Sequence, residues 1–369
     1  MRWEPGRLGR TMVGGREFPT VSLAVTPTPL HPLPRLSRAL GLDIWVKRDD
    51  LTGLAFGGNK ARKLEFLLGE ALAKGADTVL TVGAAQSNHA RMTAAAAALV
   101  GMECHLVLGG PRPTLPSGNL TLDMLAGAQC HFPGTDDWAA LESEMHALAA
   151  RLQREGRRPF AIPIGGSLPT GVLGFVRAFE ELMEQAGSLG LQPAAVVVAS
   201  SSGGTQAGLE VGRRLLSNRL GKRAALRPGG STVTGELPAI VGVGVAKTDS
   251  ELRAQVASIA SQTGRLVGLA GDIAADELEI TMAYMGPKYA AVTESCLAAI
   301  RRLAREEAIF LDPVYSGKAM AGLLDMASRG RFEAASTVIF WHTGGNVALF
   351  ATEYAALWNE PPGAGQPAA

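Results

Sequence analysis

Cysteine and net charge are both scarce in this sequence. The three cysteines, Cys104, Cys130 and Cys296, stand far apart and lack the C-x-x-C spacing of zinc and redox sites. Lysine and arginine number 35 and aspartate and glutamate 34, so the formal net charge is +1. These properties argue against a disulfide framework, a metal site, and nucleic acid or a membrane surface as the main partner.

Long apolar runs are missing as well. None approaches the roughly 18 residues that a membrane span requires, and residues 1–19 carry charges and glycines instead of an apolar signal core. Yet 47% of the 369 residues are hydrophobic, which suits a large core and about two domains. We therefore expect a soluble protein of the reducing cytoplasm, where unpaired cysteines are common.

Strand and helix patterns alternate along most of the chain. Residues 24–45 are rich in proline and predict an extended, turn-rich entry, residues 217–236 predict a long exposed loop, and residues 360–369 predict a disordered tail. The alternation predicts an α/β fold of two parallel-sheet αβ units covered by helices. Strands are predicted at 44–47, 77–82, 103–108, 160–164, 194–199, 239–245 and 337–341, and helices at 88–100, 121–128, 140–155, 205–216, 249–262, 293–307 and 317–328.

Lys60 stands at the centre of the most informative stretch. Gly57 and Gly58 precede it, and apolar residues at helical spacing across 64–71 follow it. Glycines let the backbone approach closely, and a lysine that forms a Schiff base needs a dry site that lowers its pKa. Lys60 is thus a candidate cofactor anchor, although most lysines beside glycines are simply solvated.

Two turns that join strands to helices carry candidate binding groups. Gln86, Ser87 and Asn88 follow the second predicted strand, at the sheet edge where ligands bind in open α/β sheets, although Ser87 or Asn88 can equally be an N-cap. His89 has no metal-ligand spacing to any neighbour. The turn 200–208 is rich in serine and glycine and opens a helix, which suits one phosphate group, or a turn needed for packing alone.

A third stretch, Asp312 to Met320, places Tyr315 before a glycine at a helix start. The phenol can act as an acid or base if its pKa is perturbed, or it can form a purely structural hydrogen bond.

These stretches together resemble one enzyme family. The runs Lys-Arg-Asp-Asp…Gly-Gly-Asn-Lys-x-Arg-Lys-Leu, Gln-Ser-Asn-His-x-Arg, Ser-Gly-Gly-Thr-Gln-Ala-Gly and Asp-Pro-Val-Tyr-Ser-Gly-Lys-Ala-Met resemble the D-cysteine desulfhydrase and 1-aminocyclopropane-1-carboxylate deaminase family, in the same order over about residues 20–355. The resemblance implies pyridoxal 5'-phosphate as cofactor, the tryptophan synthase β-like fold (fold type II) and a homodimer. It also implies a large cofactor-binding domain of residues 1–62 and 173–369 and a small αβ domain of residues 63–172.

The resemblance implies a role for each matching residue. Lys60 matches the lysine that holds the cofactor and returns the proton, Asn88 matches the asparagine that hydrogen-bonds the phenolic oxygen, and Ser316 lies beside the ring nitrogen. Gln86 and Ser87 resemble the residues around the substrate carboxylate, with Asn88 beside them. Two active-site tyrosines match Tyr289 and Tyr315, which together with Lys60 and Ser87 make the expected catalytic set. The expected phosphate cup comprises Ser201, Ser202, Gly203, Gly204 and Thr205.

Ser316 bears on the reaction, because the deaminases carry glutamate after the tyrosine. A carboxylate keeps the ring nitrogen protonated, whereas a hydroxyl leaves it neutral and favours β-elimination. We therefore predict a lyase acting on D-cysteine or a related β-substituted amino acid. The alternative that Ser316 is only the N-cap of the following helix stays open. The alternatives are a 1-aminocyclopropane-1-carboxylate deaminase, an L-cysteate sulfo-lyase, and a homologue that binds ligands without turnover. The sequence departs from the family pattern at 168–170 and at Asn346, so the exact substrate stays open.

Overall fold

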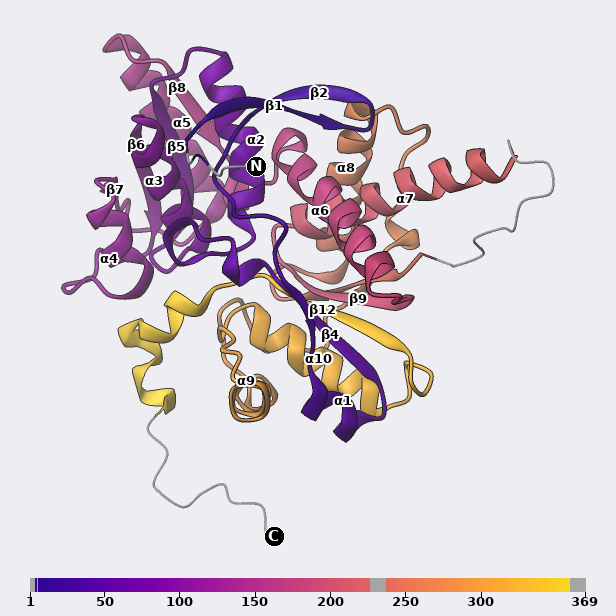
Figure 1. Ribbon diagram of the computed structural model, residues 1–369. Helices are drawn as coiled ribbons and strands as arrows, with labels where there is room; N and C mark the ends of the chain where they lie inside the picture. Colours follow the sequence, from indigo (N-terminus) through magenta and orange to yellow (C-terminus); the bar gives the residue numbers. More distant parts are fainter. Residues whose placement is uncertain (1–3, 5, 226–236, 359–369) are drawn as a thin grey trace.

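Two separate sheets organise the chain (Figure 1). The structure, a computed structural model, describes residues 4, 6–225 and 237–358, with side chains of 222–225 left out. Its helices cover the faces of both sheets, as the alternating pattern predicts. None of the helices in these ranges is long and apolar enough to span a membrane.

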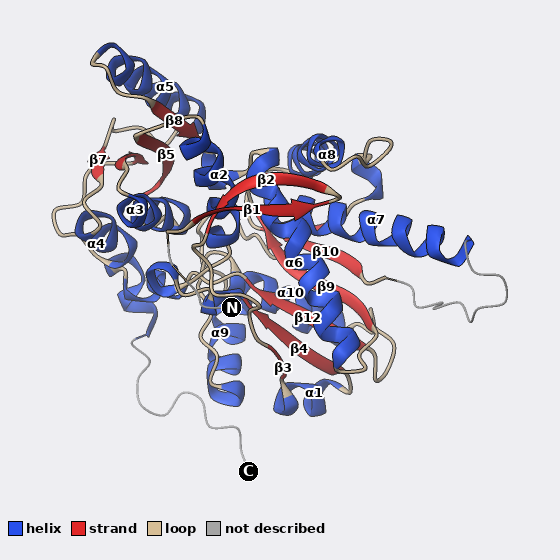
Figure 2. Cartoon of the chain, turned by 45° about the horizontal axis from the view of Figure 1, so that its top comes forward, coloured by secondary structure: helices blue, strands red, loops and turns tan. Residues whose placement is uncertain are grey.

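The larger sheet has six strands in the order β11-β10-β9-β12-β4-β3 (Figure 2). Neighbouring strands are parallel throughout except at β3, which runs antiparallel to β4 at the edge. Buried aliphatic residues fill the inner strands, as expected for a sheet covered on both faces. The strands are β3 (Leu30–Pro32), β4 (Asp43–Arg48), β9 (Pro193–Ser200), β10 (Ala239–Gly244), β11 (Glu279–Thr281) and β12 (Thr337–His342).

The smaller sheet has four parallel strands in the order β7-β6-β5-β8. All four come from residues 78–162, so this sheet is contiguous in sequence, whereas the larger sheet joins the first and last parts of the chain. An N-terminal hairpin of β1 and β2 lies apart from both sheets and packs on α2. These strands are β1 (Leu8–Val13), β2 (Arg16–Val21), β5 (Thr78–Ala84), β6 (Glu103–Gly109), β7 (Gln129–His131) and β8 (Pro159–Ile162).

Helices sandwich each sheet. Apolar residues of α1, α9 and α10 pack on one face of the large sheet, and those of α6 and α7 pack on the other. On the small sheet, α2 and α3 cover one face and α5 the other. The helices are α1 (Pro34–Leu40), α2 (Lys60–Ala73), α3 (Asn88–Val100), α4 (Gly118–Leu125), α5 (Trp138–Arg154), α6 (Pro169–Ser188), α7 (Gly204–Ala225), α8 (Asp249–Leu266), α9 (Glu294–Glu307) and α10 (Ser316–Ser328).

Three sequence expectations differ from the structure. The exposed loop predicted at 217–236 is wrong in its first part, because good helix formers carry α7 to Ala225 and Arg219 pairs with Glu180 at 2.8 Å. Residues 226–236 and the tail at 360–369 lie outside the described residues. The entry segment contains α1, which begins with proline at its first turn, and the 20-residue α6 was not predicted.

A buried ion network joins the N-terminal strand β4 to α2 and α6. The guanidinium of Arg62 donates to Asp49 at 3.0 Å and to Glu181 at 2.8 Å, and the buried ammonium of Lys47 pairs with Glu181. Burial alone would raise the pKa of Glu181, but the hydrogen bonds and charge of Arg62, with help from Lys47, lower it to about 2. Loss of one partner from such a buried network strongly destabilises the fold.

We expect Glu181→Gln to lower the free energy of unfolding by about 3 kcal/mol, because it leaves Lys47 and Arg62 with an uncompensated buried charge. The native pKa of Glu181 is about 2, below its ordinary 4.5, so its stabilisation is present above pH 4.5 and is lost as the pH falls towards 2. The variant should therefore lose less stability on acidification. Urea unfolding between pH 7 and 3 measures both effects.

Glu180→Gln is the matched control, because Glu180 pairs with Arg219 in a more exposed bridge. Its expected cost is at most about 1 kcal/mol. Equal losses in the two variants would show that the buried network does not stabilise the fold.

Candidate active site

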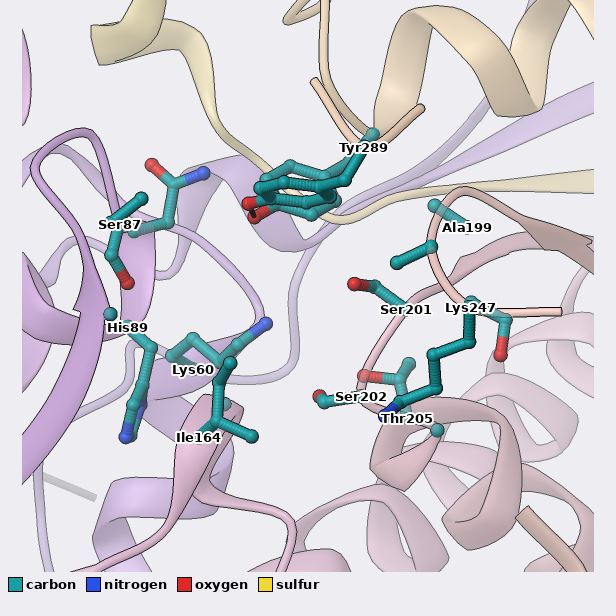
Figure 3. A pocket seen from close by; sticks show the side chains of 18 of the residues that line it. Lys60, Ser87, His89, Ile164, Ala199, Ser201, Ser202, Thr205, Lys247 and Tyr289 are labelled. Carbon is teal, nitrogen blue, oxygen red and sulfur yellow. Dashed lines mark hydrogen bonds between the residues drawn. The ribbon is translucent and has the colours of Figure 1, made fainter. Parts of the chain in front are cut away.

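A cavity of about 630 Å³ lies where the carboxyl ends of both sheets meet (Figure 3). The loops after β5, β9, β10 and β12 line it, together with the starts of α2, α5 and α7. Ligands bind at this edge in open α/β sheets, because the loops that leave parallel strands converge there. The polar and aromatic lining includes Lys60, Ser87, Asn88, His89, Trp138, Ser200, Ser201, Ser202, Gly203, Thr205, Lys247, Tyr289 and Tyr315.

Lys60 begins α2, and only Asn59 separates it from a tightly held glycine pair. Gly57 has φ +76°, and a Cβ there would lie 1.9 Å from the carbonyl oxygen of Asp50, so only glycine fits this turn. The Nζ atom of Lys60 donates to Oδ1 of Asn59 at 2.8 Å. Burial and then the charge of Arg91 lower the pKa of Lys60 to about 8, against the opposing effect of Asp312. About a tenth of Lys60 is therefore a neutral, nucleophilic amine at pH 7, far more than for an ordinary lysine.

The turn between β9 and α7 faces Lys60 across the cavity (Figure 3). Gly203 has φ +78°, and a Cβ there would meet Val256 at 2.9 Å. The first backbone N–H groups of α7 have no carbonyl partner within the helix, and the helix dipole adds positive potential at that end. The geometry suits a phosphate group, as the sequence predicts.

Lys63 lies behind this turn, and sequence reasoning did not identify it. Its ammonium is fully buried and donates to the carbonyl oxygen of Gly165 at 3.0 Å and to Oγ of Ser167 at 3.2 Å. A Cβ on Gly204 would lie 2.6 Å from Nζ, so the ammonium lies against the start of α7. Burial, and then the charge of Lys60, lower the pKa of Lys63 well below its ordinary value. An anion at the turn would favour the charged form.

The start of α3 supplies the opposite wall. Oγ of Ser87 accepts the N–H of Ala90 at 3.1 Å, so Ser87 is the N-cap and also lines the cavity. Oδ1 of Asn88 accepts from Arg91 at 3.0 Å, and Arg91 donates to the carbonyl oxygen of Gly57 at 2.8 Å. Arg91 thereby ties α3 to the loop that carries Lys60.

Two tyrosines close another side of the cavity. The phenolic oxygens of Tyr289 and Tyr315 lie 2.5 Å apart in a hydrogen bond. Burial raises the pKa of both phenols, and the charge of Asp312 adds to the effect on each. Both phenols are therefore protonated at neutral pH and can donate a hydrogen bond or a proton.

Asp312 organises the segment that carries Tyr315. Its buried carboxylate accepts the backbone N–H groups of Val314 and Tyr315 at 2.8 Å and of Ser316 at 2.7 Å. The hydroxyl of Ser316 donates to Oδ1 of Asp312 at 2.5 Å and accepts the N–H of Asp312 at 2.9 Å. The Ser316 hydroxyl is thus committed to Asp312 in this structure.

The predicted site residues converge with three exceptions. Gln86, Gly204 and Ser316 do not line the cavity, although each is next to a residue that does. Gln86 instead binds the start of α4, since its amide donates to the carbonyl of Ser117 at 3.0 Å and accepts from the N–H of Asn119 at 2.9 Å. The other predicted residues are Lys60, Ser87, Asn88, Ser201, Ser202, Gly203, Thr205, Tyr289 and Tyr315, and all of them line the cavity.

Unpartnered polar atoms indicate that the cavity is built for a polar ligand. Both ring nitrogens of His89 and the hydroxyl of Ser200 are buried and have no hydrogen-bond partner within the described part of the chain. Burial lowers the pKa of His89 well below its usual value, so the ring is neutral. No group of three metal-ligating side chains occurs among the described residues. An amine, a phosphate turn and spare polar atoms in one cavity fit pyridoxal phosphate, which carries an aldehyde, a phosphate and a polar ring.

Comparison with known proteins supports the same assignment. The family model for pyridoxal-phosphate dependent enzymes matches residues 21–344. A D-cysteine desulfhydrase from Serratia proteamaculans (strain 568) is 42% identical, with 91% of this chain and 96% of that protein covered.

Solved structures agree. The crystal structure of an ACC (1-aminocyclopropane-1-carboxylate) deaminase homologue superposes with a TM-score of 0.81 at 38% identity, covering 92% of this chain and 95% of that one. A fungal L-serine ammonia-lyase from Rhizomucor miehei, at 16% identity, 91% and 98% coverage and a TM-score of 0.63, shares the fold. The predicted fold class and cofactor are confirmed. The chain belongs to the pyridoxal-phosphate dependent enzymes, in the family that includes D-cysteine desulfhydrase and the ACC deaminase homologue.

Proposed function

We propose that this enzyme is a lyase that eliminates the β-substituent of D-cysteine or a related β-substituted amino acid. For cysteine, the α C–H and β C–S bonds break, and water completes the release of pyruvate, ammonia and hydrogen sulfide. The observation that carries the proposal is the convergence of Lys60, the 200–205 turn and the tyrosine pair on one cavity. The similarity to D-cysteine desulfhydrase supports it.

Lys60 would hold the cofactor and then move the α proton. When bound, pyridoxal phosphate supplies an electron sink for the pair left by the broken bond at the α carbon. With its pKa lowered to about 8, the amine of Lys60 can accept a proton near neutral pH and return it later. The buried turn of Gly57 and Gly58 fixes the backbone before Lys60, and Asn59 accepts a hydrogen bond from its amine, so little reorganisation is needed.

The cofactor phosphate and the substrate carboxylate would bind at opposite walls of the cavity. Ser201 to Thr205, backed by Lys63, would receive the cofactor phosphate. Ser87 and Asn88 would bind the substrate carboxylate, and Asn88 the phenolic oxygen of the cofactor, with Gln86 supporting the same loop. Arg91 adds positive charge behind this wall.

The tyrosine pair would hydrogen-bond the leaving group. Burial raises the pKa of both phenols, so they hold their protons at neutral pH. A phenol that donates to a departing thiolate stabilises the charge that develops on sulfur. The hydrogen bond between Tyr289 and Tyr315 lets the second phenol share the charge of the first.

Ser316 supports elimination over ring opening. A serine in place of glutamate supplies no carboxylate of its own to protonate the ring nitrogen, which favours loss of a β-substituent. ACC deaminase activity is the second candidate, favoured by the similarity to the ACC deaminase homologue. Two further alternatives are L-cysteate sulfo-lyase activity and ligand binding without turnover. The product assay described below distinguishes both from elimination on D-cysteine.

We also propose a division into a large cofactor-binding domain of residues 1–62 and 173–369 and a small domain of residues 63–172. The membership of the two sheets supports it. We propose a cytoplasmic location, supported by the free thiols of Cys104, Cys130 and Cys296.

We also propose a homodimer. Leu115, Met124, Leu125 and Phe350 expose 79%, 51%, 78% and 79% of their surface. Met124 and Leu125 end α4, which contacts the segment η5 (Asn346–Phe350) beside the cavity. Large apolar side chains exposed on neighbouring segments commonly mark a protein interface.

A product assay tests the reaction. We expect D-cysteine or β-chloroalanine to yield pyruvate, with sulfide from cysteine, while 1-aminocyclopropane-1-carboxylate yields little 2-oxobutyrate.

Lys60→Ala should lose the visible absorption of the bound cofactor and lower kcat by at least about a thousandfold, because positioning and proton transfer both depend on this amine.

The panel also includes L-cysteine, L-cysteate and D-serine. Formation of 2-oxobutyrate from aminocyclopropane carboxylate alone would overturn the interpretation of Ser316. A cofactor spectrum that shifts with ligand but yields no product from any of them would identify a binding protein, and a colourless protein that takes up no cofactor would refute the proposal.

The rate of cofactor uptake by the apoenzyme should rise about tenfold from pH 7 to 9, with a midpoint near 8. Only the neutral amine of Lys60 attacks the aldehyde, and its fraction grows as the pH passes its pKa. Stopped-flow absorbance measures the rate. Nα-acetyl-lysine is the reference, since an ordinary amine keeps gaining rate beyond pH 9, and a matching profile for the enzyme would contradict the lowered pKa.

Leu125→Glu should convert the homodimer to a monomer, because it places a charge in the apolar face. Light scattering after size-exclusion chromatography measures the mass. Leu189→Glu, at the end of α6 and 51% exposed, is the control and should stay dimeric. A wild-type protein that is monomeric at every concentration would exclude the dimer.

A further inference from the structure

Trp138 lines the cavity, yet the proposed reaction assigns it no role. It is the first residue of α5, and Asp137 caps this helix by accepting the N–H of Ala140 at 2.7 Å. Leu141 and Met145 anchor α5 on the small sheet. The indole therefore projects from a rigid helix start, at the cavity wall formed by the small sheet.

The indole meets a tyrosine from the segment between β11 and α9. The rings of Trp138 and Tyr289 pack edge to face, with centroids 6.2 Å apart and planes at 84°. On its other side Tyr289 packs on Tyr315, with centroids 6.2 Å apart, and the two phenols share their hydrogen bond. Tyr289 thus lies between the indole and its phenolic partner.

The backbone around Tyr289 gives it little support. Residues 282–293 contain no helix or strand, and Ala290 has φ +60°, a conformation that non-glycine residues rarely adopt. The orientation of the ring therefore depends on its side-chain contacts. Trp138 supplies the contact from the small sheet, whereas Tyr315 and the apolar cluster of Val314, Ala348, Ala351 and Tyr354 supply the others.

We propose that Trp138 is a positioning residue, which braces Tyr289 against Tyr315 across the cavity. Because the brace joins elements packed on different sheets, the phenol pair is held only when the two sheets keep this spacing. A substrate that enters the cavity between the two sheets then meets an ordered phenol pair. This inference rests on the proposed role of Tyr289 in elimination.

The first test observes the phenol and not the reaction. Holoenzyme labelled with ¹³C at the tyrosine Cζ atoms gives signals for four tyrosines, and Tyr289→Phe assigns one of them. Groups that act on Tyr289 are Tyr315 and Asp312 near the start of α10, and Glu353 and Tyr354 on η6 (Thr352–Trp358). Trp138→Leu should admit water, so that the Tyr289 phenol ionises at lower pH, and Trp138→Phe should preserve the wild-type titration.

The second test is a double-mutant cycle on elimination. Loss of an edge-to-face aromatic pair should lower kcat about three- to tenfold in Trp138→Leu, with a smaller change in KM. Trp138→Phe should stay within about threefold of wild type. If Trp138 acts through Tyr289, adding Trp138→Leu to Tyr289→Phe should cause no further loss. Glu144→Ala, an exposed change on the same helix away from the cavity, should have full activity.

The outcomes separate the two ideas. An unchanged Tyr289 titration in Trp138→Leu, or additive losses in the cycle, would refute the brace. A fully active Tyr289→Phe would refute the proposed role of Tyr289, while the titration would still test the brace. Trp138→Phe retains an aromatic edge and keeps the test valid if the leucine variant folds poorly.

Discussion

The buried pairing of Arg62 with Asp49 is the interaction on which the site depends. Asp49 follows β4 and also accepts the indole N–H of Trp341 on β12 at 2.9 Å, so its carboxylate links two strands of the large sheet to α2. Arg62 lies two residues after Lys60, at the first turn of that helix. Fixing Arg62 therefore fixes the helix start that presents the Lys60 amine, and an ion pair buried this deeply tolerates little movement.

The positive charge gathered around this pairing explains what the cavity attracts. Lys60, Lys63 and Arg91 lie near the cavity, and burial lowers the pKa of each of them. Lowered pKa values show that the protein alone does not fully solvate these cations. A cofactor phosphate and a substrate carboxylate would compensate for this lost solvation of the cations. The same burial that makes Lys60 nucleophilic therefore also favours anionic ligands.

The sequence predicts the parts of the site that are local and misses the parts that come from packing. The Lys60 stretch, the 200–205 turn and the segment of Tyr315 are each contiguous in sequence and lie at the start of a helix, so the sequence alone points to their chemistry. Lys63 was missed because only the packing of the folded chain brings its ammonium to the start of α7. The commitment of Ser316 to Asp312 depends on backbone geometry at the start of α10, which a motif does not specify. The alternation of strands and helices predicted the main strands of both sheets, whereas the short strands β3, β7 and β11 and the helix α6, buried along much of its length, were not predicted.

Substrate choice should depend on the loops where this chain departs from its family pattern. Leu168 and Pro169 start α6 directly after Ser167, whose hydroxyl bonds both Lys63 and Ser202. Asn346 follows the cavity-lining turn 343–344, and its Oδ1 atom is buried without a partner among the described residues. A buried amide oxygen left unpaired costs about 1–3 kcal/mol, which a donor on the ligand or an ordered water would recover. Ser167 thus contacts the 200–205 turn, and Asn346 lies next to the cavity lining, so changes at either segment can reach the cavity without altering the Gly57–Gly58 turn before Lys60.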